Sequence, residues 1–277
     1  MLAEFAIWLT TPVPRAIRRM GLLGDSVRLW SRGRRRKADW AAHEAQCHAV
    51  VHKAMAALAR RDTVVVLGSG LARDVPLEAL CAAFRRVMLV DAVHLLPLRL
   101  RVRRFSNVVL ETRELTGLGR LLDGRAIARI APLADLQEDT SIDLVISANV
   151  LSQLPLPVVD LIERQPGLAR LLPPDPCRAV IDWHLADCAG FKARICLLTD
   201  VAYNEQDAEG VVTETVDLLH GRALPAPDAS WDWPVAPKGE LRGGFSHMHH
   251  AQGHADFRAV CTEKGRNRLA ATHELDP

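Results

Sequence analysis

The sequence predicts one α/β domain built on a doubly wound, mostly parallel sheet of seven strands, preceded by a helical extension. Three observations support this prediction. Short apolar runs alternate with segments of helical spacing, the first run ends in Gly68-Ser69-Gly70, and the last two runs follow each other without a helix between them. We therefore predict an antiparallel edge strand, and we divide the chain into an extension (residues 1–61) and an α/β domain (residues 62–277).

The predicted strands are short runs rich in Val, Ile and Leu, which favour extended backbone when buried. They are Val64–Leu67, Val87–Asp91, Val108–Glu111, Leu144–Ser147, Ile195–Asp200, Val211–Leu219 and Asp256–Thr262. Residues 220–254, between the last two, are rich in Trp, Pro, Gly and His and are predicted to form a long loop. Trp231 and Trp233 in this loop either close over a pocket or fasten the loop to the body.

The predicted helices keep their apolar residues on one face. The longest covers Ala38–Arg61, where Trp40, Cys47 and Val51 recur at the spacing of a buried stripe. Three others begin near a capping aspartate or carry a proline in the first turn, both of which favour a helix start: Val75–Arg85, Leu156–Arg164 and Pro176–Ala189. A further helix is predicted over His94–Arg104, which is basic and rich in leucine.

Positive charge is concentrated at the start of the chain. Residues 1–61 hold 12 Lys/Arg against 4 Asp/Glu, although the whole chain carries a net charge of only +2. The densest run, Arg28–Lys37, is either a solvated arm or a contact for an anionic partner, and peripheral membrane contact is one such prediction. Its single aromatic residue, Trp30, is too little for a base-stacking platform, so nucleic acid is disfavoured.

Targeting and cysteine patterns point to a reducing compartment. Glu4 precedes the first apolar stretch and the arginines follow it, which is the reverse of a secretory signal. The six cysteines are scattered and form no CxxC pair. We therefore expect reduced thiols and a cytoplasmic protein.

The turn after the first strand predicts a nucleoside site. Glycine has no side chain, so the backbone N–H groups of Gly68-Ser69-Gly70 can approach a ligand closely. Asp91 ends the second strand, about 20 residues further on, which is the spacing of a carboxylate that binds ribose hydroxyls. The alternative is that the glycines only turn the chain and Asp91 only caps the next helix.

Over roughly residues 63–262 the chain resembles the class I S-adenosylmethionine-dependent methyltransferases. The resemblance lies in VVVLGSGLA, in Asp91 of VMLVDAVH, in Glu114 of LETRELTG and in the segment Asp143–Asn149, which contains the fourth strand. It implies a Rossmann-like fold and S-adenosylmethionine as cofactor, with Glu114 near the adenine. The cofactor-binding residues that it implies are Gly68, Ser69, Gly70, Asp91, Ala92, Glu114, Ser147, Ala148 and Asn149.

The chain departs from the family pattern at two positions. Val66 stands where many members have an acid, and Ala72 stands at the usual third glycine. Asp74 could replace the acid near the methionine amino group of the cofactor. These departures leave open a second interpretation, a catalytically inactive scaffold that binds a nucleoside or a partner through its basic N-terminal arm. A nicotinamide-binding fold shares the glycines and the acid, but Ala72, Asp74 and the antiparallel finish disfavour it.

Methyl transfer needs closeness, alignment and a base for an acceptor that carries a proton. Asp200 closes the fifth strand and Tyr203 follows it, so both are predicted at the active edge. His43, on the first long helix, is a candidate because N-terminal helices of the resembled family cover cofactor and substrate. We expect the acceptor to be a small or amphiphilic molecule.

Histidines gather in residues 247–254. A transition metal can bind such a run, but no cysteine accompanies it, so we predict no metal site. A histidine of this run acting as a base is the more consistent interpretation. His48 and His52 have metal-ligand spacing on a helix, yet they lack a third ligand nearby in sequence.

Overall fold

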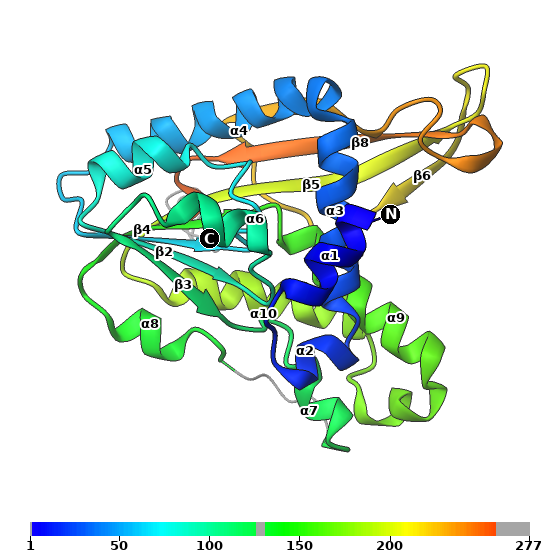
Figure 1. Ribbon diagram of the computed structural model, residues 1–277, viewed down its shortest axis with the longest axis horizontal. Coiled ribbons are helices and arrows are strands. Elements are labelled where there is room, and N and C mark those ends of the chain that lie inside the picture. Colours follow the sequence, from blue (N-terminus) through cyan, green and yellow to red (C-terminus); the bar gives the residue numbers. More distant parts are fainter. Residues whose placement is uncertain (1, 126–130, 259–277) are drawn as a thin grey trace, which may run out of the picture.

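A computed structural model describes residues 2–125 and 131–258, and it has the doubly wound, Rossmann-like architecture that the sequence predicts (Figure 1). The strand order is β3-β2-β1-β4-β5-β8-β7, and β6 pairs with β5 off this path. The sheet therefore has eight strands rather than seven. The strands are β1 (Thr63–Leu67), β2 (Arg86–Asp91), β3 (Val108–Thr112), β4 (Ile142–Ala148), β5 (Arg194–Gln206), β6 (Val212–Asp217), β7 (Ala229–Ala236) and β8 (Ser246–His254).

Strands β1 to β5 are parallel, whereas β8 runs antiparallel to both of its neighbours, β5 and β7. The strand order reverses between β1 and β4, because the chain leaves β1 toward β2 on one side and returns to β4 on the other. In open parallel sheets, ligands bind beyond the carboxyl ends of the strands at such a point. The glycine turn follows β1 and therefore lies at this place.

Helices cover both faces of the sheet. The helices are α1 (Leu2–Thr10), α2 (Arg15–Arg19), α3 (Leu22–Arg35), α4 (Lys37–Ala56), α5 (Leu77–Ala83), α6 (Leu96–Val102), α7 (Leu118–Leu122), α8 (Ala134–Glu138), α9 (Leu156–Arg164) and α10 (Pro176–Gly190). Alternate residues of β1 point to opposite faces: Val65 and Leu67 join the core under α10, and Val64 and Val66 join the core under α4. Because both faces of β1 are buried, its sequence is a nearly continuous apolar run and not an alternation of apolar and polar residues.

The prediction of a loop over residues 220–254 is wrong, because β7 and β8 lie within it. Strand β8 reads SHMHHAQGH, and this composition concealed a strand that is defined by its pairing with β5 and β7. The predicted strand Val211–Leu219 is confirmed as β6. Of the predicted strand Asp256–Thr262, residues 256–258 form a turn and the start of a helix, and the rest lies outside the described residues.

The N-terminal helices belong to the body of the protein. Ile7, Leu23 and Trp30 are buried in the same core as Val93 and Leu95, which follow β2. Helices α1 to α3 consequently lie across the carboxyl edge of the sheet (Figure 1). Among the described residues, no helix is both long and apolar enough to cross a bilayer.

Gly68 has both a conformational and a packing reason to lack a side chain. Its φ is +70°, and a Cβ at this residue would lie 2.4 Å from the Cβ of Val150. We predict that Gly68→Ala lowers the free energy of unfolding by about 3 kcal/mol or more, from backbone strain plus the clash. Urea unfolding measures this loss.

Gly124→Ala is the matched control, since Gly124 has φ +72° and a Cβ there would meet nothing within 4 Å. The control is expected to lose only about 1 kcal/mol, the cost of the strained backbone alone. Equal losses in the two variants would contradict the packing argument.

Candidate functional site

The carboxylate of Asp91 faces the glycine turn. The backbone N–H of Gly70 donates to Asp91 Oδ2 at 2.7 Å, and the N–H of Val93 donates to Oδ1 at 3.1 Å. Burial raises the pKa of Asp91, and these two backbone bonds offset part of that increase. The side chain thus joins the ends of β1 and β2 and stays at the rim of the sheet rather than turning into solvent.

The space beside Gly70 is open, whereas the backbone N–H groups of Gly68 and Ser69 both donate to the carbonyl of Val90. Gly70 has φ +48°, and a Cβ added there would have no heavy atom of the described residues within 4 Å. The hydroxyl of Ser69 is buried and has no hydrogen-bond partner among the described residues. An open backbone position beside an unpaired buried hydroxyl and a carboxylate fits a polar group such as a ribose. Ala72 stands where the resembled family has glycine. Its φ of +53° lies in the left-handed region that glycine adopts most easily, so the backbone conformation there is glycine-like although the residue is alanine.

Other predicted cofactor residues are already partnered within the protein. The carboxylate of Glu114 accepts hydrogen bonds from the backbone N–H of Thr116 and of Gly117 (2.8 Å for the latter), and burial raises its pKa. The Ser147 hydroxyl lies 2.9 Å from His184 Nε2 of α10, on one face of β4. Ala148 packs into the core on the opposite face. Ala92 is half-buried beside Asp91.

His43 is completely buried in a polar and aromatic cluster. The indole Nε1 of Trp231 donates to His43 Nδ1 at 3.0 Å, and the ring of Trp233 stacks on the imidazole with centroids 3.8 Å apart. His43 Nε2 lies 3.5 Å from Asp74 Oδ1 and 3.2 Å from the amide nitrogen of Asn149. The predicted residues His43, Asp74 and Asn149, from three separate segments, are therefore in contact.

The ligand atoms of His43, Cys47 and Asp74 lie within 4.8 Å of one another, which is close enough to consider a metal. The bond from Trp231 decides against it. Because Nδ1 accepts that bond, the neutral ring carries its proton on Nε2, the nitrogen that faces Asp74. Burial also raises the pKa of the Cys47 thiol well above its usual value, so the thiolate is disfavoured. These three side chains are therefore arranged for hydrogen bonding and not as ligands of a metal ion.

The charge of Asp74 is preserved within this cluster. Burial acts to raise its pKa, but the hydrogen bond from His43, with contributions from Asn149 and Arg73, holds the pKa below its ordinary value. A carboxylate that stays ionised at the end of the glycine turn is a natural partner for a cationic group. Asp74 thus keeps the negative charge for which it was predicted to lie near the methionine amino group of a cofactor. Its contact with a ligand stays a prediction.

A second group forms around Asp200, also a predicted residue. Its Oδ2 lies 2.5 Å from His249 Nδ1, and its Oδ1 accepts a hydrogen bond from the Ser152 hydroxyl. Tyr203 stacks on His249, with ring centroids 5.2 Å apart. His249 Nε2 makes no hydrogen bond to any residue in the described part of the chain. This is an Asp–His pair whose outer nitrogen remains available for proton transfer.

Trp233 connects the two groups. It stacks on His43 and makes an edge contact with His249, with ring centroids 5.8 Å apart. It also packs edge-on against Trp40 of α4. The two tryptophans of β7 therefore fasten that strand to α4. Their alternation, Trp231 and Trp233 with Asp232 between them, was the sequence signal for the strand that the prediction missed.

The sequence predicted a base among the histidines of residues 247–254, but it did not identify His249 as the one beside Asp200. Strand β8 lies between β5 and β7, and His249 is opposite Tyr203 of β5 and Trp233 of β7. These two cross-strand partners distinguish His249 from the other histidines of the run. His250 instead pairs with Asp232 at 2.7 Å, and it is more exposed. Nothing in the local sequence separates these two neighbours, since only the strand register does so.

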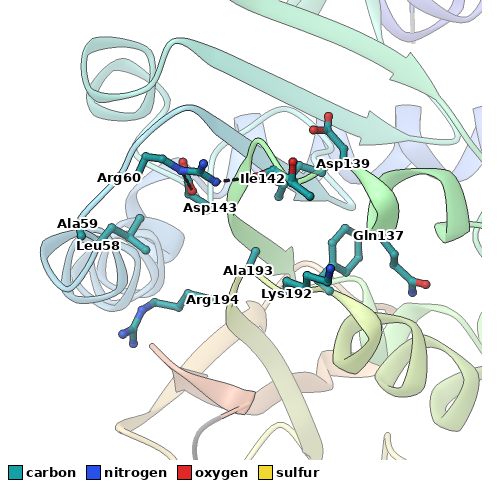
Figure 2. Close-up of a pocket in the computed structure, with 12 residues that line it drawn as sticks. Leu58, Ala59, Arg60, Gln137, Asp139, Ile142, Asp143, Lys192, Ala193 and Arg194 are labelled. Carbon is teal, nitrogen blue, oxygen red and sulfur yellow. Dashed lines mark hydrogen bonds and ion pairs between the residues drawn. The ribbon is translucent and has the colours of Figure 1, made fainter.

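Two cavities lie away from this edge. One, of about 310 Å³, is at the amino ends of β4 and β5, where Arg60 pairs with Asp143 and Arg194 lies beside them (Figure 2). The other, of about 390 Å³, lies beside β6 and includes Arg222 and Gln252. Neither includes a residue of the glycine turn.

No protein-family model matches the sequence, and no curated protein matches it. The chain is similar in structure to 1,6-didemethyltoxoflavin-N1-methyltransferase from Burkholderia thailandensis, solved with S-adenosylhomocysteine, at 16% identity over 88% of this chain and 92% of that one, with a TM-score of 0.42. It is also similar to the N-methyltransferase NodS from Bradyrhizobium japonicum, at 11% identity, 77% and 87% coverage and a TM-score of 0.36.

Below neutral pH, a histidine behind the site should control stability. Burial lowers the pKa of His184 to about 4, from an unfolded value of about 6.5. Between these two pH values, His184 is protonated in the unfolded chain but not in the folded protein. The free energy of unfolding therefore decreases as the pH decreases through this interval, by about 3 kcal/mol from this residue. In His184→Gln, urea unfolding is expected to show a clearly shallower pH dependence in that interval.

The exposed His52 supplies the control, because His52→Gln should keep the slope of the unmodified protein. A His184→Gln slope parallel to that of the unmodified protein would show that His184 is not the group responsible. Burial lowers the pKa of His94 and of His254 in the same direction, so part of the pH dependence is expected to remain.

Proposed function

We propose that the protein is an S-adenosylmethionine-dependent methyltransferase acting on a small or amphiphilic acceptor. The observation that carries this proposal is the rim at the carboxyl ends of β1 and β2, where Asp91 faces an open, side-chain-free Gly70. This rim stands at the point where strand order reverses, which is where this class of sheet binds nucleotides.

The described residues fit the cofactor at both of its ends. Asp91 and the unpaired Ser69 hydroxyl suit the ribose, and the Glu114 loop follows the neighbouring strand on the adenine side. Asp74, ionised and half-exposed, suits the amino group of the methionine moiety. When bound, the cofactor supplies a methyl group activated by a sulfonium centre.

His249 is proposed as the base for the acceptor. Asp200 holds the Nδ1 side of the ring, which leaves Nε2 to take the proton of an acceptor hydroxyl or amine. Tyr203 and Trp233 fix the plane of the ring from the two neighbouring strands. Methyl transfer is an in-line displacement, so a fixed base and aromatic walls contribute mainly by alignment and by exclusion of water.

His43, a candidate base in the sequence, is better suited to positioning. Its Nδ1 is occupied by Trp231, its Nε2 is directed toward Asp74, and none of the residue is exposed. It therefore holds the Asp74 carboxylate in place and has no free nitrogen to accept a proton from a substrate.

Cofactor binding tests the proposal directly. Titration calorimetry is expected to show binding of S-adenosylmethionine and S-adenosylhomocysteine, and Asp91→Ala should weaken it by about 10- to 100-fold, the effect of removing charged hydrogen bonds. Asp139→Ala is the matched control, because Asp139 also accepts a loop N–H, that of Ser141, but at the amino edge of the sheet. Absence of heat with both compounds, in folded protein, would favour the non-catalytic scaffold.

The role of His249 predicts a separation of binding from turnover. His249→Gln should leave cofactor affinity unchanged and lower methyl transfer by about 100-fold or more, because the base is lost. The assay follows radioactive methyl from S-adenosylmethionine into the small molecules of a cell extract. His247→Gln, which removes the other ring stacked on Tyr203, should retain activity. Equal losses in the two variants would argue for a merely structural role of the stack.

A further inference from the structure

Helix α1 presents an apolar face to solvent. Leu2, Phe5 and Leu9 are 89%, 63% and 63% exposed, and they lie at the i, i+3 and i+7 positions of one helical stripe. The opposite face holds the helix in place: Ile7 is buried in the main core, and Glu4 accepts a hydrogen bond from Ser31 of α3. An anchored helix whose outward stripe is apolar is a docking surface rather than an unfinished core.

The surroundings of this stripe are cationic. Helices α1 to α3 contain seven arginines but only two acidic residues, Glu4 and Asp25. Arg28 is 75% exposed, and Arg18 lies over the ring of Trp8, the remaining large side chain of α1's outer surface. A tryptophan and arginines around an exposed apolar stripe are the composition of helices that lie in a bilayer interface.

The basic run at the end of α3 contributes less than the sequence suggested. Arg32, Arg35 and Arg36 all converge on the nearly buried carboxylate of Glu240, in the connection between β7 and β8. These side chains fasten α3 to the connection between β7 and β8, and Arg35 and Arg36 also lie 3.9 Å from Glu4 and 3.8 Å from Asp39, respectively. The surface free to meet an anionic partner is therefore centred on α1 rather than on the predicted Arg28–Lys37 run as a whole.

We propose that α1 docks the protein on an anionic lipid bilayer, lying in the plane of the interface with Leu2, Phe5 and Leu9 among the headgroups. A second copy of the chain is the less favourable occupant, because a two-fold interface would bring this cationic surface against itself. The inner face of α1 covers the edge of the sheet that carries the glycine rim. Docking therefore places the cover of the candidate site at the membrane, where an amphiphilic molecule is presented.

Vesicle sedimentation of the full chain, without added cofactor, tests this docking independently of the proposed methyl transfer. The vesicles are pure phosphatidylcholine, or phosphatidylcholine with roughly a third phosphatidylglycerol. The protein should sediment with the anionic vesicles, and Phe5→Ser with Leu9→Ser should lower the partition coefficient at least about tenfold, since two buried apolar side chains are lost. Both positions are exposed, so circular dichroism should show an unchanged fold.

The matched control is Val211→Ser with Val212→Ser, two exposed apolar residues at the distant turn between β5 and β6. This variant should sediment like the unmodified protein. Failure of the unmodified protein to sediment with anionic vesicles would overturn the proposal. So would a concentration-dependent dimer in light scattering that Phe5→Ser with Leu9→Ser abolishes, because the stripe would then be an interface between copies.

Discussion

A single extra residue in β5 positions the Asp200–His249 pair. The pairing of β5 with β8 shifts by one between Asp200 and Ala202, so Val201 is a bulge. Without it, Asp200 would stand opposite Gln252 and point to the other face of the sheet. With it, Asp200 is opposite Ala251 and shares a face with His249, two residues along β8. The Asp200–His249 contact exists only because of this local irregularity.

The same strand also builds the framework around that pair. The first half of β5 is parallel to β4 and buried, and its second half extends to Gln206 and carries β6 on one side and β8 on the other. The extension lets β7 reach α4, where Trp233 is inserted beside His43. One long strand thus supports both polar groups of the site, and the ring of Trp233 joins them by stacking on His43 and making an edge contact with His249.

The glycine rim and the Asp200–His249 pair lie at the same edge of the sheet but differ in origin. The rim is set by local chemistry: a tight turn, a capping carboxylate and an unhindered backbone. The pair is set by long-range pairing between segments about 50 residues apart. Such a division suits a protein in which one half of the site recognises a common ligand and the other half is shaped around a particular acceptor.

The sequence alone determined the parallel core, the helices that cover it, the switch point and the glycine–Asp91 juxtaposition, because these features depend on apolar periodicity and on glycine and aspartate at strand ends. It also singled out Asp200, Tyr203 and His43. Only the tertiary structure decided that residues 220–254 contain two strands, that His249 rather than His250 meets Asp200, and that Arg32, Arg35 and Arg36 are held by Glu240. Each of these depends on register or on a contact between distant segments, and local sequence patterns carry no information about either.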